Sequence, residues 1–410
     1  LAVTLALGCI HVQAQNILLV HSISELQAAI NGSAPGDTLV VSNGTYINSN
    51  LVINKNGITI KAETPGGVYL NGAQYIDIVG DNNTFSGFQF TSGDIGEAFV
   101  IEVSGDHNLL TQLNFNGYSA KKYIQFEAGS QYNELSYSNI ENKPANAVIG
   151  CTIQISTSFN TPGYHSIHHC SFKNFPGDGG DFGNEPIRIG LGAERDNISR
   201  TVVEYCYFEN VGKGDGESIS IKCCENVCRY NTFTNNPDGM LVFRNGDRDV
   251  AYGNFFINNS GGIRVKEARD TYCYNNYFET GAVEPIVLQY VAEMPLVNAN
   301  FIYNTFVNCD RIDLGRKGPA SVTFANNIFS NSSGSIFKNA TGAENYINNL
   351  VKGSLGIPAN VGLINSDAAL QINDEGYYEL SANSIAINAA TNDYPSMIDI
   401  TELNDDPDIL

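Results

Sequence analysis

Three basic residues at equal intervals are the part of the sequence best suited to chemistry. Lys222, Arg244 and Lys266 follow one another at steps of 22 residues. Each ends a short segment in which apolar residues alternate with other residues, and a period of two predicts a strand with one buried face. The basic side chains then lie on the exposed face. Equal steps place them one above the other if each strand belongs to the next coil of a solenoid.

A lysine and an arginine on neighbouring coils can bind an anion and take up a proton. Strands in register lie roughly 4.8 Å apart, so Lys222 and Arg244 repel each other unless an anion lies between them. This repulsion lowers the pKa of the lysine toward the range of a general base. The alternative interpretation is a solvated basic ladder paired with surface carboxylates, which the spacing alone does not exclude.

Two carboxylates precede the lysine in the sequence. Asp215 and Glu217 flank Gly216, which predicts a turn that lets both side chains converge. With Asn184 from the coil below, they supply the oxygen ligands of a hard cation such as calcium. A simple salt bridge to Arg188 or Lys213 explains the same carboxylates equally well.

The elements that must position these residues form a repeat. Its unit is a small or polar residue, a variable residue and Phe, followed by an Asn-rich turn, as in segments 231–233 and 276–278. Successive units are about 23 residues apart, with strands and no helical pattern between them, which is typical of a parallel β-helix. The Phe side chains then stack in the core, and the Asn, which tolerate left-handed turn positions, form amide ladders. We therefore predict an all-β solenoid, with residues 15–410 as a single domain and a loop insertion at 192–199.

Both ends of the solenoid need a cover, because the last coils would otherwise expose apolar rungs. Segment 22–30 has the apolar spacing of a helix, with Ser22 or Ser24 as N-cap, and predicts an N-terminal helical cap. Segment 377–387 is expected to close the far end.

Composition and the first residues bear on location and partners. A formal charge of -21 argues against nucleic acid, because phosphate binding needs a basic field. It does not exclude an anionic sugar held by a local basic cluster. Residues 1–14 form an apolar segment with an A-x-A-like end, and predict a signal peptide truncated at its start and a secreted or periplasmic protein. A lipid anchor at Cys9 is the weaker alternative. No later segment approaches the roughly 20 apolar residues of a membrane span.

Cysteine and histidine give less information. Export permits disulfides, but the cysteines fall near repeat positions, and we expect stacked core thiols rather than bridges. His168 and His169 are adjacent, so that they are expected to face opposite sides of a strand and to be structural. No motif predicts an oligomeric state.

Several segments together resemble polysaccharide lyase family 6, the right-handed parallel β-helix family of alginate lyases and chondroitinase B. The resemblance covers most of the chain after residue 15, and the segments that carry it are 184–190, 215–222, 229–233, the strand of Arg244, 261–264 and 275–278. The resemblance implies a right-handed β-helix with Lys222 as the Brønsted base and Arg244 as the acid. It also implies that calcium is held by Asn184, Asp215 and Glu217.

This chain departs from the family pattern at three points. Asp215 stands where the family usually has Glu, which shortens the reach to the ion. Asn245 stands where the family usually has His after the catalytic Arg, so that a substrate contact is changed. The strand of Arg244 also carries one extra residue.

The resemblance implies a calcium-assisted lyase that cleaves a uronic-acid polysaccharide by β-elimination. Calcium withdraws charge from the uronate carboxylate, the lysine takes the C5 proton, and the arginine assists departure of O4. The product carries a 4,5-double bond. The candidate residues for binding neighbouring sugars are Arg188, Arg264, Lys266 and Asn245; general surface charge is the alternative for the basic ones.

Other substrates and other functions follow from the same sequence. Alginate is expected rather than dermatan sulfate or chondroitin, because no dense basic patch for sulfates is present. A β-helix hydrolase of the polygalacturonase type would need clustered outward Asp residues. A carbohydrate-binding β-helix without catalysis, holding a structural calcium, is the non-enzymatic alternative.

Overall fold

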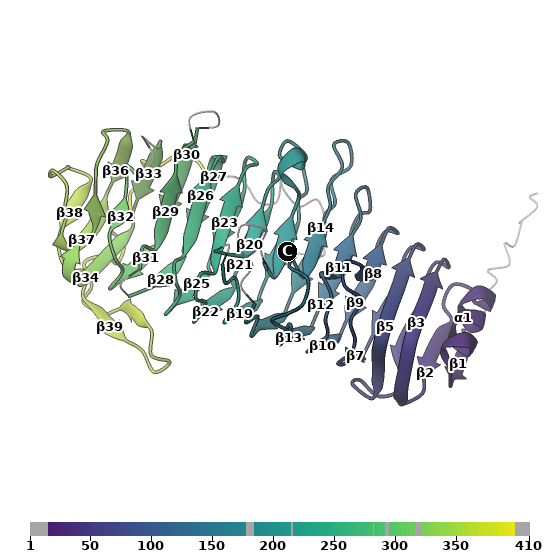
Figure 1. The fold of residues 1–410 in the computed structure, drawn as a ribbon. Coiled ribbons are helices and arrows are strands. Elements are labelled where there is room, and N and C mark those ends of the chain that lie inside the picture. Colours follow the sequence, from purple (N-terminus) through teal and green to yellow (C-terminus); the bar gives the residue numbers. More distant parts are fainter. Residues whose placement is uncertain are drawn as a thin grey trace, which may run out of the picture.

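The strands of the protein stack along one axis into a parallel β-helix (Figure 1). The computed structural model describes residues 15–177, 184–214, 216–281, 283–291, 295–316, 318 and 321–397. The expected all-β parallel β-helix with an N-terminal helical cap is confirmed. The predicted signal segment 1–14 lies outside the described residues.

The cap helix α1 (Ile23–Gly32) covers the N-terminal end of the stack. Ser22 is its N-cap, because the Ser22 Oγ accepts a hydrogen bond of 3.1 Å from the backbone N–H of Glu25. Leu26 and Ile30 are buried against the first coil. They shield the apolar end of the core from water.

One continuous sheet, called the flank sheet here, runs along the solenoid with every neighbouring pair of strands parallel. It consists of β1 (Ile17–Val20), β2 (Thr38–Val41), β4 (Thr59–Ala62), β6 (Thr84–Ser86), β9 (Leu109–Thr111), β12 (Glu134–Ser136), β15 (Ser166–His168), β18 (Val202–Glu204), β21 (Val227–Arg229), β24 (Val250–Tyr252), β27 (Arg269–Tyr274), β30 (Val297–Ile302), β33 (Val322–Ala325) and β36 (Glu344–Ile347).

A second row of strands carries the repeat phenylalanines and is called the phenylalanine sheet. It consists of β7 (Phe88–Phe90), β10 (Asn114–Asn116), β13 (Asn139–Glu141), β16 (Ser171–Lys173), β19 (Tyr207–Glu209), β22 (Thr232–Thr234), β25 (Phe255–Ile257), β28 (Tyr277–Glu279), β31 (Thr305–Val307), β34 (Ile328–Ser335), β37 (Asn349–Ser354) and β38 (Leu363–Asn365).

A third row, the cation sheet, carries the basic residues singled out in the sequence. It consists of β8 (Phe99–Val103), β11 (Lys122–Phe126), β14 (Ile153–Ile155), β17 (Ile187–Ile189), β20 (Glu217–Ile221), β23 (Met240–Arg244), β26 (Ile263–Lys266) and β29 (Ile286–Gln289), and is extended by β32 (Ile312–Asp313) and β35 (Phe337–Lys338).

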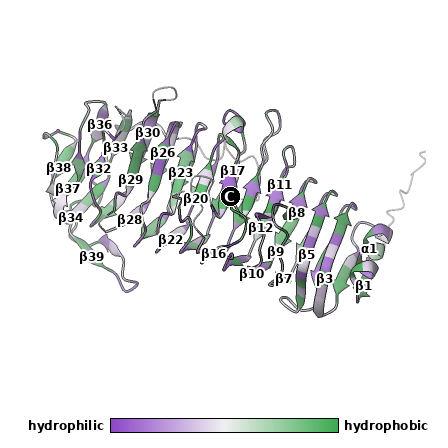
Figure 2. Ribbon diagram, viewed as in Figure 1, coloured by the Kyte–Doolittle hydropathy of each residue, from purple (hydrophilic) through white to green (hydrophobic). Residues whose placement is uncertain are grey.

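Two long strands join the phenylalanine and cation sheets at the N-terminal end. β3 (Gly44–Ile53) pairs with β5 (Val68–Ile78), whose first half pairs with β7 and whose second half pairs with β8. Hydrophobic and hydrophilic residues alternate along these strands (Figure 2). Their inward residues enter the core, and their outward residues form the surface.

Stacked rings and amides fill the inside of the coils, as the repeat predicts. Ring centroids in the series Phe172, Phe208, Phe233, Phe256, Phe278, Phe306 and Phe329 are 4.7 to 5.0 Å apart. A buried ladder joins Asn231, Asn254, Asn276, Asn304, Asn327 and Asn349, each amide donating to the next carbonyl at 2.9 to 3.1 Å. The structural interpretation of the repeated Asn is confirmed.

The turn conformation expected of these Asn falls on a different residue. The left-handed φ belongs to the residue before the ladder position, for example Tyr230 (φ 56°) before Asn231 and Asn275 (φ 53°) before Asn276. The ladder residue itself points inward, where its amide satisfies backbone groups of neighbouring coils. One residue therefore makes the corner and the next one holds the coils together.

The cysteines from Cys151 to Cys309 are free and buried thiols, as expected.

The expectation that His168 and His169 face opposite sides of a strand is wrong. His169 has a φ of 53°, which ends the strand alternation, and its Nδ1 lies 2.8 Å from that of His168. The His169 ring stacks between Tyr137 and Tyr205, which fits a structural role.

The segment expected to close the far end lies elsewhere. β39 (Leu370–Ile372) and β40 (Tyr378–Leu380) form an antiparallel hairpin. Its Tyr377 ring lies 5.5 Å from Phe255 and 6.1 Å from Tyr277, so that the chain folds back along the side of the solenoid. Phe255 is exposed at the surface of the phenylalanine sheet and offers an apolar contact that a polar coil end does not.

Candidate active site

The outer face of the cation sheet presents the basic residues in two columns along the solenoid. In the first column, strand pairing aligns Arg188 with Ser220, Ser220 with Val242, and Val242 with Arg264. In the second column, Arg244 is paired with Lys266, and Ile221 is paired with Phe243, so that Lys222 falls beside Arg244. Adjacent members lie roughly 4.8 Å apart along the axis. The columnar spacing predicted from the 22-residue step is confirmed.

Lys222 is half-buried in this face, with a pKa below that of an ordinary lysine. Burial is the largest cause of the lowered pKa, and the charges of Arg188 and Arg244 lower it further, against the opposing effect of Glu185 and Glu217. The sequence identified repulsion by Arg244 and missed the larger effect of burial. Among the described residues, Lys222 Nζ has no hydrogen-bond or ion-pair partner. The amine is therefore available to a ligand on this face.

Glu217 lies beneath the basic columns and is completely buried. Its Oε1 accepts a hydrogen bond from Arg264 Nη2 and lies 3.8 Å from Arg244 Nη1. Among the described residues, Glu217 pairs with these arginines and not with Arg188 or Lys213, the partners considered from the sequence. Gly216 (φ 77°) makes the predicted turn, and the pairing with β23 shifts register between Glu217 and Ile219. This shift directs the carboxylate toward the arginines.

Three buried oxygen atoms near the basic columns lack a hydrogen-bond partner among the residues that the structure describes. They are Asn184 Oδ1, Glu217 Oε2 and Glu185 Oε2. Burying such atoms without partners is costly, and carboxylate and amide oxygens are the ligands that a hard cation takes. The chemistry of this donor set therefore fits calcium. Asp215, the remaining predicted ligand, lies outside the described residues.

Glu185 is a site residue that sequence reasoning missed. Burial raises the pKa of its carboxyl, while Arg188 lowers it and Glu217 raises it, so that the three charges lie close together. Glu185 lies two residues before β17 and is only 1 % exposed. Its position next to the predicted ligand Asn184 was the available signal.

The other predicted substrate-binding residues differ in the side chains to which they are bound. Arg188 donates from Nε to Gln154 Oε1 at 2.8 Å, and Lys266 Nζ lies 3.5 Å from Glu267 Oε1. Arg264 is held by Glu217, and only 18 % of its side chain is exposed. Arg264 is therefore engaged by a carboxylate, whereas Arg188 is bound to a neutral glutamine.

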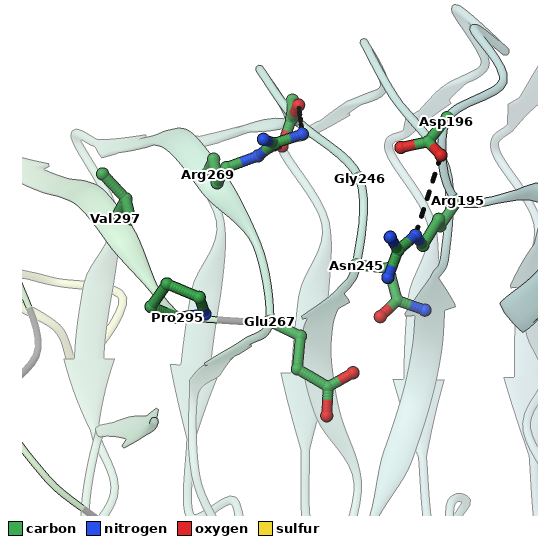
Figure 3. A pocket seen from close by; sticks show the side chains of 9 residues that line it. Arg195, Asp196, Asn245, Gly246, Glu267, Arg269, Pro295 and Val297 are labelled. Atoms are coloured by element: carbon green, nitrogen blue, oxygen red, sulfur yellow. Dashed lines mark hydrogen bonds and ion pairs between the residues drawn. The ribbon is translucent and has the colours of Figure 1, made fainter. Parts of the chain in front are cut away.

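Asn245 and Glu267 directly follow the second column and line a pocket of about 370 Å³ (Figure 3). Asn245 is 7 % exposed and its Oδ1 has no hydrogen-bond partner. Arg195 and Asp196, from the predicted insertion, lie on one side, and Arg269, paired with Asp247 at 2.6 and 2.8 Å, lines the same pocket. The insertion begins with a short 3-10 helix, Gly192–Glu194.

These features define a class of protein: a parallel β-helix with basic side chains aligned along one sheet above buried carboxylates, which suits a long anionic ligand. Residues 20–311 match the family model of chondroitinase B. The match extends over more than half of the sequence, and the chain belongs to the chondroitinase B family of polysaccharide lyases. The resemblance to polysaccharide lyase family 6 is thereby confirmed.

Solved structures share the fold. The PL6 family alginate lyase AlyGC is 23 % identical with a TM-score of 0.77, and the match covers 93 % of this chain and 59 % of that one. A mannuronic acid specific family 6 lyase from human gut microbiota is 23 % identical with a TM-score of 0.70, over 83 % of this chain and 87 % of that one. A PL6 alginate lyase in complex with a trisaccharide is 16 % identical with a TM-score of 0.67, over 93 % and 96 %.

The chain spans about 59 % of the length of AlyGC. A comparison with curated proteins gives no match. Within the described part of the chain, no helix has the length and apolar character needed to cross a membrane.

Proposed function

We propose that the protein cleaves alginate, a uronic-acid polysaccharide, by calcium-assisted β-elimination, with Lys222 as the base and Arg244 as the acid. The observation that carries this proposal is the half-buried Lys222, with its lowered pKa, in register with Arg244 beside buried oxygens that lack partners. Proton removal, departure of the leaving group and binding of the cation then each have a candidate group. We further propose that the protein acts outside the cytoplasm, where a polysaccharide is accessible.

The amine of Lys222 takes the C5 proton. A lysine with a lowered pKa is neutral in a larger fraction of molecules near neutral pH, and only the neutral amine can accept a proton. The guanidinium of Arg244 donates hydrogen bonds to O4 and stabilises the negative charge that develops as the C4–O4 bond breaks, and the departing oxygen takes its proton from water. The electron pair of the C5–H bond forms the 4,5-double bond.

The buried oxygens would hold the cation. Asn184, Glu217 and Glu185 supply donor atoms, and Asp215 is the further ligand proposed from the sequence. Calcium, when bound, withdraws charge from the uronate carboxylate and so makes the C5 proton more acidic. Glu217 also fixes Arg264 and Arg244 through its other oxygen. Arg188, Lys266 and Asn245 would contact neighbouring sugars.

Dermatan sulfate or chondroitin is the second candidate substrate, because the matching family model is that of chondroitinase B. Alginate is favoured because the basic residues form two narrow columns rather than the broad patch that sulfate groups require. In support, two of the similar structures are alginate lyases.

Ultraviolet absorbance of the unsaturated uronate tests the proposal. We expect the absorbance to rise when the protein is mixed with alginate and calcium, and not with dermatan sulfate. Lys222→Ala and a calcium chelator should each abolish the rise, while Lys352→Ala, a lysine paired with Asp367 far from the columns, should not change it. Alginate binding without any rise in absorbance would favour the carbohydrate-binding alternative.

A further inference from the structure

The outer face of the cation sheet changes the sign of its charge along the solenoid. Strand pairing continues the first column toward the N-terminal end, aligning Arg188 with Gln154, Gln154 with Gln125, Gln125 with Glu102, and Glu102 with Asp77. One uninterrupted row of outward side chains therefore runs from carboxylates through amides to an arginine. The proposed catalytic residues lie only at the basic end of this row.

The carboxylates of the acidic end are close enough to affect each other. Glu127 hydrogen-bonds to the Glu102 carboxyl, and its charge raises the pKa of both Glu102 and Asp77, in addition to the larger effect of burial. We call these three residues, Asp77, Glu102 and Glu127, the acidic stop. A like-charged cluster of this kind repels any further anion placed on it.

Lys122 offsets the charge of the acidic stop only in part: it lowers the pKa of Glu102, but by less than burial and the neighbouring carboxylates raise it. Lys122 Nζ donates to Gln125 Oε1 at 3.0 Å and lies 4.4 Å from the centre of the Phe99 ring. Gln125 in turn donates to Glu127. A glutamine thus stands between the lysine and the carboxylate. The charge of the stop faces the surface next to the basic columns.

The direction of the basic columns fixes how a polyanion lies on the face. Arg188 and Arg264 belong to strands separated by β20 and β23, and Lys222, Arg244 and Lys266 occupy successive coils. An anionic chain that pairs with them in turn runs along the solenoid axis, across the strands. Going toward the N-terminal end, it meets Glu102 three strands beyond Arg188, or after about 14 Å.

We propose that the acidic stop ends the substrate-binding face, so that a uronate polymer occupies few positions on the N-terminal side of Lys222 and extends freely only toward β29. This inference rests on the proposed function, because it assumes an anionic polysaccharide on the basic columns. Gln125 and Gln154, both buried and neutral, form the boundary between the accepting and the repelling part. Sugars placed beyond the boundary lower the affinity of the polymer instead of adding to it. The acidic stop therefore limits the positions along the face at which a polymer can bind.

Binding of uronate oligomers of increasing length tests this. The Lys222→Ala variant is used as the background so that the oligomers are not cleaved, and Kd is measured by calorimetry at low ionic strength. In this background we expect affinity to rise with oligomer length and then to level off. When Asp77→Asn, Glu102→Gln and Glu127→Gln are added, affinity should continue to rise with oligomer length. The longest oligomers should then bind at least threefold more tightly than they bind the background. The gain should shrink in high salt.

The matched control carries the same change of charge elsewhere. The control variant carries Glu141→Gln and Glu209→Gln on the phenylalanine sheet and Asp374→Asn in the β39–β40 hairpin. Its affinity should level off at the same oligomer length as that of the Lys222→Ala background. If the stop variant levels off there too, the acidic stop is wrong and the proposed function is unaffected. If neither this background nor the unsubstituted protein binds a uronate oligomer of any length, the proposed function fails and the acidic stop fails with it.

Discussion

Glu217 and Arg264 form an ion pair across an intervening strand: the carboxylate on β20 is fully buried, and the guanidinium reaches it from β26, past β23. Arg244, on that intervening strand, approaches the same oxygen at 3.8 Å. Within the described part of the chain, the second oxygen of Glu217 has no hydrogen-bond partner. One carboxylate thus fixes two arginines with one oxygen and leaves the other for a cation.

Replacing Glu217 by Gln tests its two proposed roles, fixing the two arginines and binding a cation. The substitution keeps the shape of the side chain but removes the charge that balances Arg264 and Arg244. We expect a loss of about 2–4 kcal/mol in the free energy of unfolding and a calcium affinity at least tenfold weaker, measured by urea unfolding and calorimetry.

The control for this variant is a comparable pair outside the site. Glu204 Oε2 lies 2.5 Å from Arg229 Nε on the flank sheet, and both side chains are largely buried. Glu204→Gln should lower stability in the same way and leave calcium affinity unchanged. Unchanged calcium binding in Glu217→Gln would show that Glu217 is purely structural.

Lys222→Arg tests whether the lysine acts as a base or only as a positive charge. Arginine keeps the charge of the column but is not deprotonated in proteins, so that it cannot accept the C5 proton. We expect kcat on alginate to fall by roughly 10²–10⁴-fold, with a much smaller change in KM. The exposed Lys352→Arg is the control. A variant that retains more than a tenth of the parent kcat would rule out the base role.

Much of this arrangement could be predicted because in-register parallel strands repeat sequence spacing as spatial order. The 22-residue step placed Lys222, Arg244 and Lys266 in one column for this reason. The burial of Glu217 could not be predicted in the same way. It depends on a register shift between two strands and on an arginine 47 residues away, and neither leaves a local pattern.

The position of the C-terminal hairpin could not be predicted from a local sequence pattern either. Segment 377–387 has no periodicity that identifies its partner, and its contact with Phe255 and Tyr277 depends on which surface residues the finished solenoid exposes. Glu185 was overlooked for a related reason. It precedes β17 and belongs to no strand pattern, and only the fold shows that its carboxylate is buried beside the basic columns.

Asn254→Ala tests the contribution of the amide ladder. Asn254 is completely buried, accepts from both the backbone and side-chain N–H of Asn231, and donates to Asn276. Alanine leaves these partners unsatisfied inside the protein, and we expect a loss of roughly 3–5 kcal/mol in the free energy of unfolding. The exposed Asn50→Ala is the control and should change it by less than about 0.5 kcal/mol. Equal effects of the two variants would contradict a stabilising ladder.

His165 makes the stability of the fold depend on pH. Its Nδ1 accepts a hydrogen bond of 3.1 Å from the backbone N–H of Asn133, and complete burial lowers its pKa to about 3. As pH falls below about 6.5, the unfolded chain takes up a proton on this histidine while the folded chain does not. The stability contributed by the neutral ring is therefore present above that pH and lost on acidification.

His165→Asn should remove this pH dependence. Asparagine presents an oxygen to the same N–H, as Asn133 itself does toward the backbone N–H of Asn108 one coil earlier, and it does not titrate. We expect the variant to be less stable than the parent at pH 7.5, because it loses the contact of the ring with Phe126. Between pH 7.5 and pH 5 the parent should lose about 2 kcal/mol more than the variant in urea unfolding. His107→Asn, at an exposed ring, should retain the pH dependence of the parent, and the same slope in His165→Asn would mean that His165 does not stay neutral in the folded protein.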